Sequence, residues 1–314
     1  MRRSTFALLL TTLSLSGCGS DASSPAVPTP TPTPTTCSAP TWVTKAAIAP
    51  NVQFHTFASK SAGTTVSFHV YLPASYASSG TRTYPVLYWL HGTHGGAQNI
   101  SAVASTLSAA MSSGIMPEMV VVFVNGLPEG MWVDAKSGRT PVESVLVHDL
   151  IPYVDSLFRT IASREGRGIE GFSMGGYGAA RLAMKHPGLF RVAVMIAAGP
   201  LDLDFQGPVA QVEPALRARI FSCVYGDDLD YYRQSSPMRI AESNGSSVSG
   251  RVELMQLVGD RDVTYSNNVE FHLLLDRLGV RHQFIVFPGI DHNPEALLAA
   301  SLNARSALYS RVFN

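Results

Sequence analysis

The sequence predicts an α/β fold in which a mostly parallel, doubly wound sheet is opened by an antiparallel hairpin and carries helices on both faces. Two patterns lead to this prediction. The first two strand-like segments alternate apolar and polar residues, as strands with one solvent-facing side do. After them, short continuous apolar runs alternate with helical stretches, the order expected for parallel strands buried on both faces. With 314 residues, 46% of them hydrophobic, the chain is long enough for one large α/β domain.

Each element is predicted from its own periodicity. The hairpin is expected from alternating residues at 52–58 and 64–72. Continuous apolar runs predict buried strands at 85–90, 119–124, 168–172, 191–197, 251–258 and 283–287. Apolar spacing of about 3.6 residues predicts helices at 101–111, 141–161, 174–185, 266–278 and 294–312. The stretch 201–250 is less regular, with one short helix near 226–232, and is expected to lie over the edge of the sheet where a site forms.

The N-terminus has the pattern of a targeting segment. Arg2 and Arg3 precede an apolar run from Phe6 to Leu15 that is too short to span a bilayer. The run ends in Leu15-Ser16-Gly17-Cys18, which resembles the cleavage motif of bacterial lipoproteins. That resemblance implies that Cys18 becomes the lipidated residue, with an ordinary secretory signal as the alternative.

Three regions follow from this pattern. Residues 1–17 are predicted to be a lipoprotein signal peptide, residues 18–40 the lipidated cysteine and a Pro/Thr-rich tether, and residues 41–314 the folded domain. The protein is therefore expected to be exported and held at the bacterial cell envelope by its N-terminal lipid. In that oxidising location Cys37 and Cys223 could form a disulfide, and the sequence leaves their pairing open.

The most informative motif is Gly-Phe-Ser-Met-Gly, centred on Ser173. The five-residue pattern alone is weak, but here a predicted strand precedes it and a small-residue helix follows it. That context is typical of a nucleophile elbow, a strand-to-helix turn that exposes the serine hydroxyl. Ser173 is therefore the predicted nucleophile.

A serine nucleophile needs a base and an acid that orients the base, and both are predicted downstream. His292 is the expected base because it follows a predicted strand and a Gly-containing loop. Asp262 and Asp260 both follow the preceding strand. Asp262 is preferred as the acid, since it reaches further beyond the strand end, and Asp260 is the alternative. Protonation of His292 should lower kcat/KM on acidification.

Acyl transfer also needs hydrogen-bond donors where negative charge develops on the carbonyl oxygen. The backbone N–H of Met174, directly after the nucleophile, is one predicted donor. The second is Thr93, in the loop His-Gly-Thr-His-Gly-Gly after a buried strand. His91 and His94 in this loop have no matching ligands nearby in the sequence, so loop structure is preferred over metal binding.

With these residues placed, the chain resembles the putative esterase family of α/β-hydrolases, which includes esterase D, feruloyl and acetylxylan esterases and mycolyltransferases. The resemblance rests on YWLHGTHGG, IEGFSMGGYGAARLAMKHPGLF, GDRD and FPGIDH. It implies an α/β-hydrolase fold, a triad of Ser173, Asp262 and His292, and an oxyanion hole formed by Thr93 and Met174. It also implies that Trp132 and Asp134 line the substrate pocket; packing of the aromatic ring under a loop is the alternative for Trp132.

The function predicted from these observations is serine carboxylic ester hydrolysis through an acyl-enzyme, with no cofactor and no metal. The chain has 23 basic and 23 acidic residues, so its net charge gives no indication of nucleic-acid binding. The expected substrate is a small-molecule or polysaccharide-linked ester, and no protein partner is predicted. An acyltransferase using the same site, or a non-catalytic tethered binding module, are the alternatives.

Overall fold

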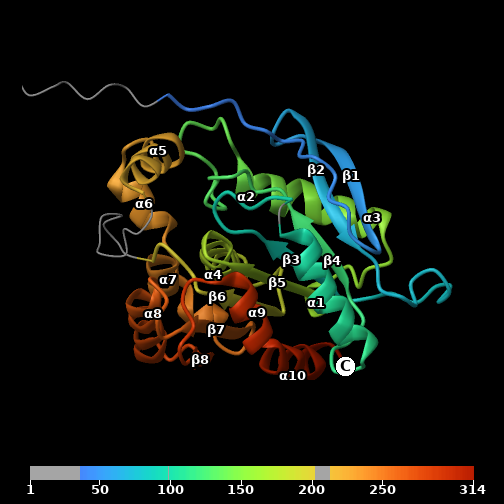
Figure 1. Cartoon of the computed structure of the whole chain (residues 1–314). Helices are drawn as coiled ribbons and strands as arrows, with labels where there is room; N and C mark the ends of the chain where they lie inside the picture. The colour runs from blue at the N-terminus through green and yellow to red at the C-terminus, as the bar shows by residue number, and fades with distance from the viewer. Residues whose placement is uncertain (1–35, 98, 202–212) are drawn as a thin grey trace, which may run out of the picture. The chain divides into compact units, whose positions relative to one another are not determined.

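One sheet organises the folded part of the chain (Figure 1). The computed structural model describes residues 36–97, 99–201 and 213–314, so the predictions for residues 1–35, including Cys18, lie outside the described residues. The sheet has eight strands in the order β1-β2-β4-β3-β5-β6-β7-β8. The strands are β1 (Val52–Ser59), β2 (Thr64–Tyr71), β3 (Val86–Leu90), β4 (Val120–Val124), β5 (Arg167–Phe172), β6 (Val192–Ile196), β7 (Glu253–Gly259) and β8 (Gln283–Phe287).

The hairpin and the parallel core are both confirmed. β2 runs antiparallel to β1 and to β4, and the strands from β4 to β8 pair in parallel. All five residues of β3 are buried. Tyr88 and Leu90 belong to the core on one face of the sheet and Leu87 and Trp89 to the core on the other. A strand buried on both faces therefore reads as a continuous apolar run.

Helices cover both faces. On one face lie α1 (Ile100–Ser112), α9 (Pro294–Ala300) and α10 (Leu302–Phe313). On the other lie α2 (Val142–Ser144), α3 (Ile151–Leu157), α4 (Met174–Lys185), α5 (Pro214–Tyr225), α6 (Leu229–Ser235), α7 (Pro237–Val248) and α8 (Tyr265–Arg277). No helix among the described residues is both long enough and apolar enough to cross a bilayer.

The predicted helix at 141–161 is not a regular α-helix. It contains a π-helical stretch, Val145–Leu150, between α2 and α3. Pro152 lies in the first turn of α3 and has no N–H to donate to the preceding turn. A change of hydrogen-bond register before a proline is a common way to accommodate it within a continuous helix.

The predicted helix at 294–312 is interrupted at Ser301, between α9 and α10. The Arg305 guanidinium explains the interruption, because its Nη2 donates to the Leu298 carbonyl (2.9 Å) and its Nη1 to the buried Glu170 carboxylate (2.6 Å). The Tyr309 hydroxyl donates to the same carboxylate. This buried network fastens α10 to the middle of β5.

The expectation of irregular structure between 201 and 250 is wrong for residues 214–225 and 237–248, which form α5 and α7. Local signals explain the helices. Pro214 and Pro237 occupy first-turn positions, and the side chains of Asp228 and Ser236 accept hydrogen bonds from backbone N–H groups as N-caps. The short helix predicted near 226–232 is observed as α6, and residues 202–212 lie outside the described part of the chain.

A disulfide joins Cys37 to Cys223. It links the segment before β1 to α5, across 186 residues of sequence. The compact unit of the fold includes the described residues that precede β1, from residue 36 onward. Residues 37–40, at the end of the predicted tether, therefore lie against the domain and form part of a pocket described below.

Candidate active site

Ser173 sits in the turn between β5 and α4 with a backbone conformation that non-glycine residues rarely adopt (φ +56°, ψ −117°). The end of β6 and the segment after it hold this turn, because the Ser173 N–H donates to Ile196 O (2.9 Å) and the Gly199 N–H donates to Ser173 O (3.2 Å). A Cβ at Gly175 would lie 1.9 Å from Leu90 O, so only glycine allows α4 to begin this close to β3. The predicted elbow geometry is thus present.

The structure brings together the three residues predicted as a triad. His292 Nε2 lies 2.9 Å from Ser173 Oγ, and His292 Nδ1 lies 2.9 Å from each Asp262 carboxylate oxygen. A carboxylate can only accept, so Nδ1 carries a proton and Nε2 is free to accept the serine hydroxyl proton. The Asp262 side chain is fully buried, whereas that of His292 is 29% exposed.

Asp260 does not contact the base. Its carboxylate accepts the Gly289 N–H (2.7 Å) and thereby fastens the loop after β7 to the loop after β8. The Arg261 N–H donates to Ile290 O (3.1 Å) and strengthens the same junction. The two loops that carry the acid and the base are therefore held together by their backbones, and of the two candidate acids only Asp262 points at His292.

Thr264 is a supporting residue that sequence reasoning missed. Its N–H and hydroxyl both donate to Asp262 Oδ1, at 2.7 and 2.8 Å. These bonds orient the carboxylate toward His292. Thr264 lies two residues after Asp262, the spacing of an Asx-turn, in which an aspartate accepts the N–H two residues later.

The two predicted oxyanion donors lie beside the serine. A Cβ on Gly92 would come 3.4 Å from Ser173 Cβ, which places the loop containing Thr93 directly against the nucleophile. Among the described residues, the N–H groups of Thr93 and Met174 have no hydrogen-bond acceptor in the protein. Unpaired backbone donors next to a serine Oγ are the arrangement that an oxyanion hole requires.

The His91 side chain stabilises this loop. Its Nδ1 donates to Gly92 O (2.8 Å), and its Nε2 accepts the Gly126 N–H (3.2 Å). Both ring nitrogens are therefore occupied by backbone partners. Burial lowers the pKa of His91 to about 4, against a smaller opposing effect of the hydrogen bond to Gly92. Only the neutral ring can donate to Gly92 O and also accept the Gly126 N–H.

Acidification is expected to weaken the fold through His91. Its pKa is about 4 in the folded chain and 6.5 for an unperturbed histidine, so the unfolded chain takes up the proton first. The stabilisation is complete above pH 6.5 and is lost as the pH falls through about 4. Between pH 7 and 4, urea unfolding should show a loss on the order of 3 kcal/mol that is absent in His91→Gln. Equal pH slopes for the two proteins would contradict this assignment.

Trp132 does not line the substrate pocket, and that prediction is wrong. Its side chain is fully buried and packs against Gly126 and Gly178, while Nε1 donates to His91 O (3.3 Å). The ring therefore supports, from inside the core, the loop that carries Thr93. Its alternative interpretation, packing under a loop, is the one observed, since substrate cannot reach a side chain with no exposed surface.

Asp134 is partly exposed, but its carboxylate serves a neighbouring element. It accepts hydrogen bonds from the Ser144 N–H (2.9 Å) and hydroxyl (2.6 Å) at α2. It also borders a polar cavity of about 890 Å³ lined by Glu143, Arg181 and Lys185. The lining of that cavity includes neither Ser173 nor His292.

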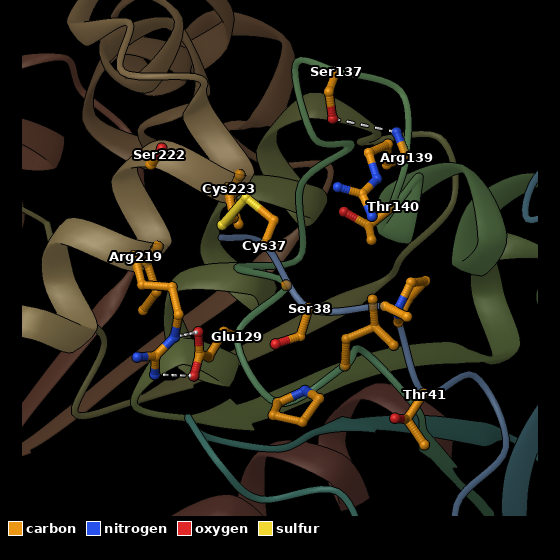
Figure 2. A pocket seen from close by; sticks show the side chains of 17 residues that line it. Cys37, Ser38, Thr41, Glu129, Ser137, Arg139, Thr140, Arg219, Ser222 and Cys223 are labelled. Carbon is orange, nitrogen blue, oxygen red and sulfur yellow. Dashed lines mark hydrogen bonds and ion pairs between the residues drawn. A yellow bond between two sulfur atoms is a disulfide. The ribbon is translucent and has the colours of Figure 1, made fainter. Parts of the chain in front are cut away.

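A second pocket, of about 350 Å³, lies beside the disulfide (Figure 2). The segment 37–41, the loop 127–130 and α5 form its walls, and Glu129 and Arg219 make a two-point ion pair across it (2.6 and 2.9 Å). Its exposed lining is mostly apolar. The loop 127–130 also contacts the loop that carries Thr93, because the His94 N–H donates to Pro128 O (2.9 Å). The pocket therefore adjoins the segment that carries Thr93, and its lining, like that of the polar cavity, includes neither Ser173 nor His292.

Comparison with protein families gives a match over residues 59–269 to the family described as "Putative esterase". An esterase of Mycobacterium tuberculosis is 33% identical over 147 residues, 46% of this chain and 31% of that protein. A protein of Xylanibacter ruminicola named endo-1,4-beta-xylanase/feruloyl esterase is 30% identical over 158 residues, 48% of this chain and 22% of that protein. The chain thus matches less than a third of the length of these relatives.

Solved structures share the fold. A ferulic acid esterase superposes with a TM-score of 0.69 at 23% identity, covering 83% of this chain and 98% of that one. An S-formylglutathione hydrolase from Staphylococcus aureus superposes with a TM-score of 0.64 at 20% identity, covering 82% and 98% of the two chains. The α/β-hydrolase fold predicted from the sequence is confirmed.

Proposed function

The chain belongs to the "Putative esterase" family, and from this premise we propose that it hydrolyses carboxylic esters with Ser173 as nucleophile, His292 as general base and Asp262 as the residue that orients the base. One observation carries the proposal. The contacts from Ser173 Oγ to His292 Nε2 and from His292 Nδ1 to the Asp262 carboxylate, each 2.9 Å, place the base to take the proton of the nucleophile and the acid to orient the base.

In the first half of the reaction, Ser173 Oγ attacks the ester carbonyl carbon while its proton passes to His292 Nε2. The carbonyl oxygen becomes an oxyanion that accepts hydrogen bonds from the N–H groups of Thr93 and Met174, each contributing about 2.7–4 kcal/mol by analogy with measured oxyanion donors. The C–O bond to the alcohol then breaks, and the leaving oxygen takes the proton from Nε2. An acyl-enzyme and the free alcohol result.

In the second half, water attacks the acyl-enzyme and gives one proton to His292 Nε2. Collapse of the second oxyanion breaks the bond to Ser173 Oγ, which regains that proton, and the carboxylic acid leaves. Asp262 stays ionised and stabilises the imidazolium formed in each half. These steps need only side chains and backbone of this chain and water.

The proposed substrate is a small-molecule or polysaccharide-linked ester. The pocket beside the disulfide is a candidate binding site for either the acyl group or the alcohol group of this ester. Leu127, Ile220 and Val224 provide an apolar lining, and its wall at Pro128 touches the loop that carries Thr93. The names of two similar proteins, a feruloyl esterase and a ferulic acid esterase, make hydroxycinnamoyl esters the first to test.

We also propose that the protein is exported and lipid-anchored through Cys18 at the bacterial cell envelope. The motif ending at Cys18 supports this proposal. The Cys37–Cys223 disulfide is consistent with it, because structural disulfides persist in oxidising compartments. Mass spectrometry of the membrane fraction should detect a diacylglyceryl-modified N-terminal cysteine, and an unmodified soluble form would count against the anchor.

The direct test of the hydrolase proposal is labelling with a fluorophosphonate, followed by a screen of acetyl, feruloyl and longer acyl esters. We expect one label per chain, on the peptide containing Ser173, and release of acid from at least one ester class. Product analysis with added alcohols separates hydrolysis from acyl transfer. A folded protein that neither labels nor releases acid would instead be the tethered binding module.

A further inference from the structure

A cluster of metal-ligating side chains lies away from the triad, between α8 and β8. His272 and Asp276 are four residues apart on α8 and so share one face of the helix, and His282 directly precedes β8. In the part of the chain that the structure describes, this is the one group of three such side chains whose ligand atoms lie close enough for a metal, all within 4.8 Å of one another. Figure 1 shows α8 and β8 at the same end of the sheet.

The hydrogen bonds of the two histidines place His272 Nδ1 and His282 Nε2 opposite each other. His282 Nδ1 lies 2.8 Å from Val280 O, and because a carbonyl only accepts, this nitrogen carries a proton. In the neutral ring, Nε2 of His282 therefore presents its lone pair. It faces His272 Nδ1 at 2.7 Å, so one proton occupies the space between two imidazoles. A metal cation can replace that proton.

The groups around the two rings suit such an exchange. His272 Nε2 lies 3.5 Å from Asp276 Oδ2, so a ring bound to metal through Nδ1 would direct its remaining N–H toward a carboxylate. Likewise, the Val280 carbonyl accepts the N–H of His282 Nδ1 while Nε2 faces the metal position. Paired partners of this kind orient imidazole ligands and raise their basicity. The Phe284 ring stacks on His272, with centroids 4.4 Å apart, and holds its plane.

The gap between the rings needs only a small adjustment. Two Zn–N bonds of about 2.0–2.1 Å at a tetrahedral angle place the nitrogens about 3.4 Å apart. The rings would separate by less than about 1 Å, a shift well within side-chain rotation at these partly exposed positions. Both histidines are partly exposed, so water can supply the remaining ligands.

The ligand chemistry selects the class of metal. A carboxylate, Glu253, and two guanidinium groups, Arg281 and Arg311, line the small cavity that His282 borders. Imidazole nitrogens favour Zn²⁺ and Cu²⁺, whereas Ca²⁺ and Mg²⁺ require oxygen ligands. We propose that His272 Nδ1 and His282 Nε2 bind one Zn²⁺ or Cu²⁺ ion, with Asp276 hydrogen-bonded to His272, and that the ion ties α8 to the edge strand β8.

Titration of the full-length chain, purified without a polyhistidine tag, with ZnCl₂ in an isothermal calorimeter tests this proposal. We expect one Zn²⁺ per chain and a rise in Tm, because an ion that binds only the folded state stabilises it. CaCl₂ should produce neither effect. His282→Ala should abolish Zn²⁺ binding, and Asp276→Asn, an exposed position, should weaken it by about 10-fold or more.

Two controls make the result specific. His148→Ala removes an exposed histidine elsewhere and should leave Zn²⁺ binding unchanged, as should His292→Ala, which removes the histidine of the triad. Ester turnover by His282→Ala should match the unsubstituted protein, which shows that the variant is folded. Absence of Zn²⁺ binding by the unsubstituted protein, binding that survives His282→Ala, or binding that disappears only in His292→Ala would overturn the proposal.

Discussion

Replacing Ser173 with alanine should lower kcat for ester hydrolysis by a factor on the order of 10⁴–10⁶, because it removes the atom that forms the acyl-enzyme. The fold should persist. Alanine keeps the Cβ of serine, and the hydrogen bonds that hold the turn come from the backbone of Ser173. Initial rates with a p-nitrophenyl ester measure the loss, and thermal unfolding measures stability.

The matched control is Ser156→Ala. Ser156 is exposed on α3, and its hydroxyl donates only within its own helix, to Tyr153 O (2.7 Å). That variant should keep full activity. Turnover by Ser173→Ala within about 10-fold of the unsubstituted protein would remove Ser173 from the mechanism, and with it the proposed function.

Asp262→Asn should reduce kcat by about 10⁴-fold, as loss of the orienting carboxylate does in other serine hydrolases. Asparagine presents only one acceptor, and its NH₂ group can face His292 Nδ1. A donor in that place favours the tautomer in which Nε2 carries the proton, so the ring can no longer accept from Ser173. The change should appear in kcat more than in KM.

The matched control for Asp262→Asn is Asp260→Asn, measured in the same assay. The two aspartates are two residues apart on the same loop, but Asp260 accepts only the Gly289 N–H, which an asparagine oxygen can also accept. Asp260→Asn should therefore change kcat less than about 3-fold, within the usual range for a surface substitution. Loss of activity in Asp260→Asn with retention in Asp262→Asn would reverse the assignment.

Much of the fold and part of the site were predictable because their signals are local. Alternation in β1 and continuous apolar runs in β3 to β7 report how many faces of each strand are buried. Burial departs from this rule in β2, where residues 66–71 are all buried, and in the edge strand β8, where none is. The strand-to-helix setting of Ser173 depends on residues within one turn of it. The two helices that were not predicted between 214 and 248, α5 and α7, also have local signals, because Pro214 and Pro237 occupy their first turns.

The sequence by itself determined the order of elements, the elbow at Ser173 and the loops from which an acid, a base and backbone donors would come. Only the tertiary structure decided between Asp260 and Asp262, placed Trp132 inside the core, paired Cys37 with Cys223 and set His272 against His282. The physical reason is range. Periodicity and turn chemistry act between residues a few positions apart, whereas each of these partnerships depends on where distant strand ends and helices meet.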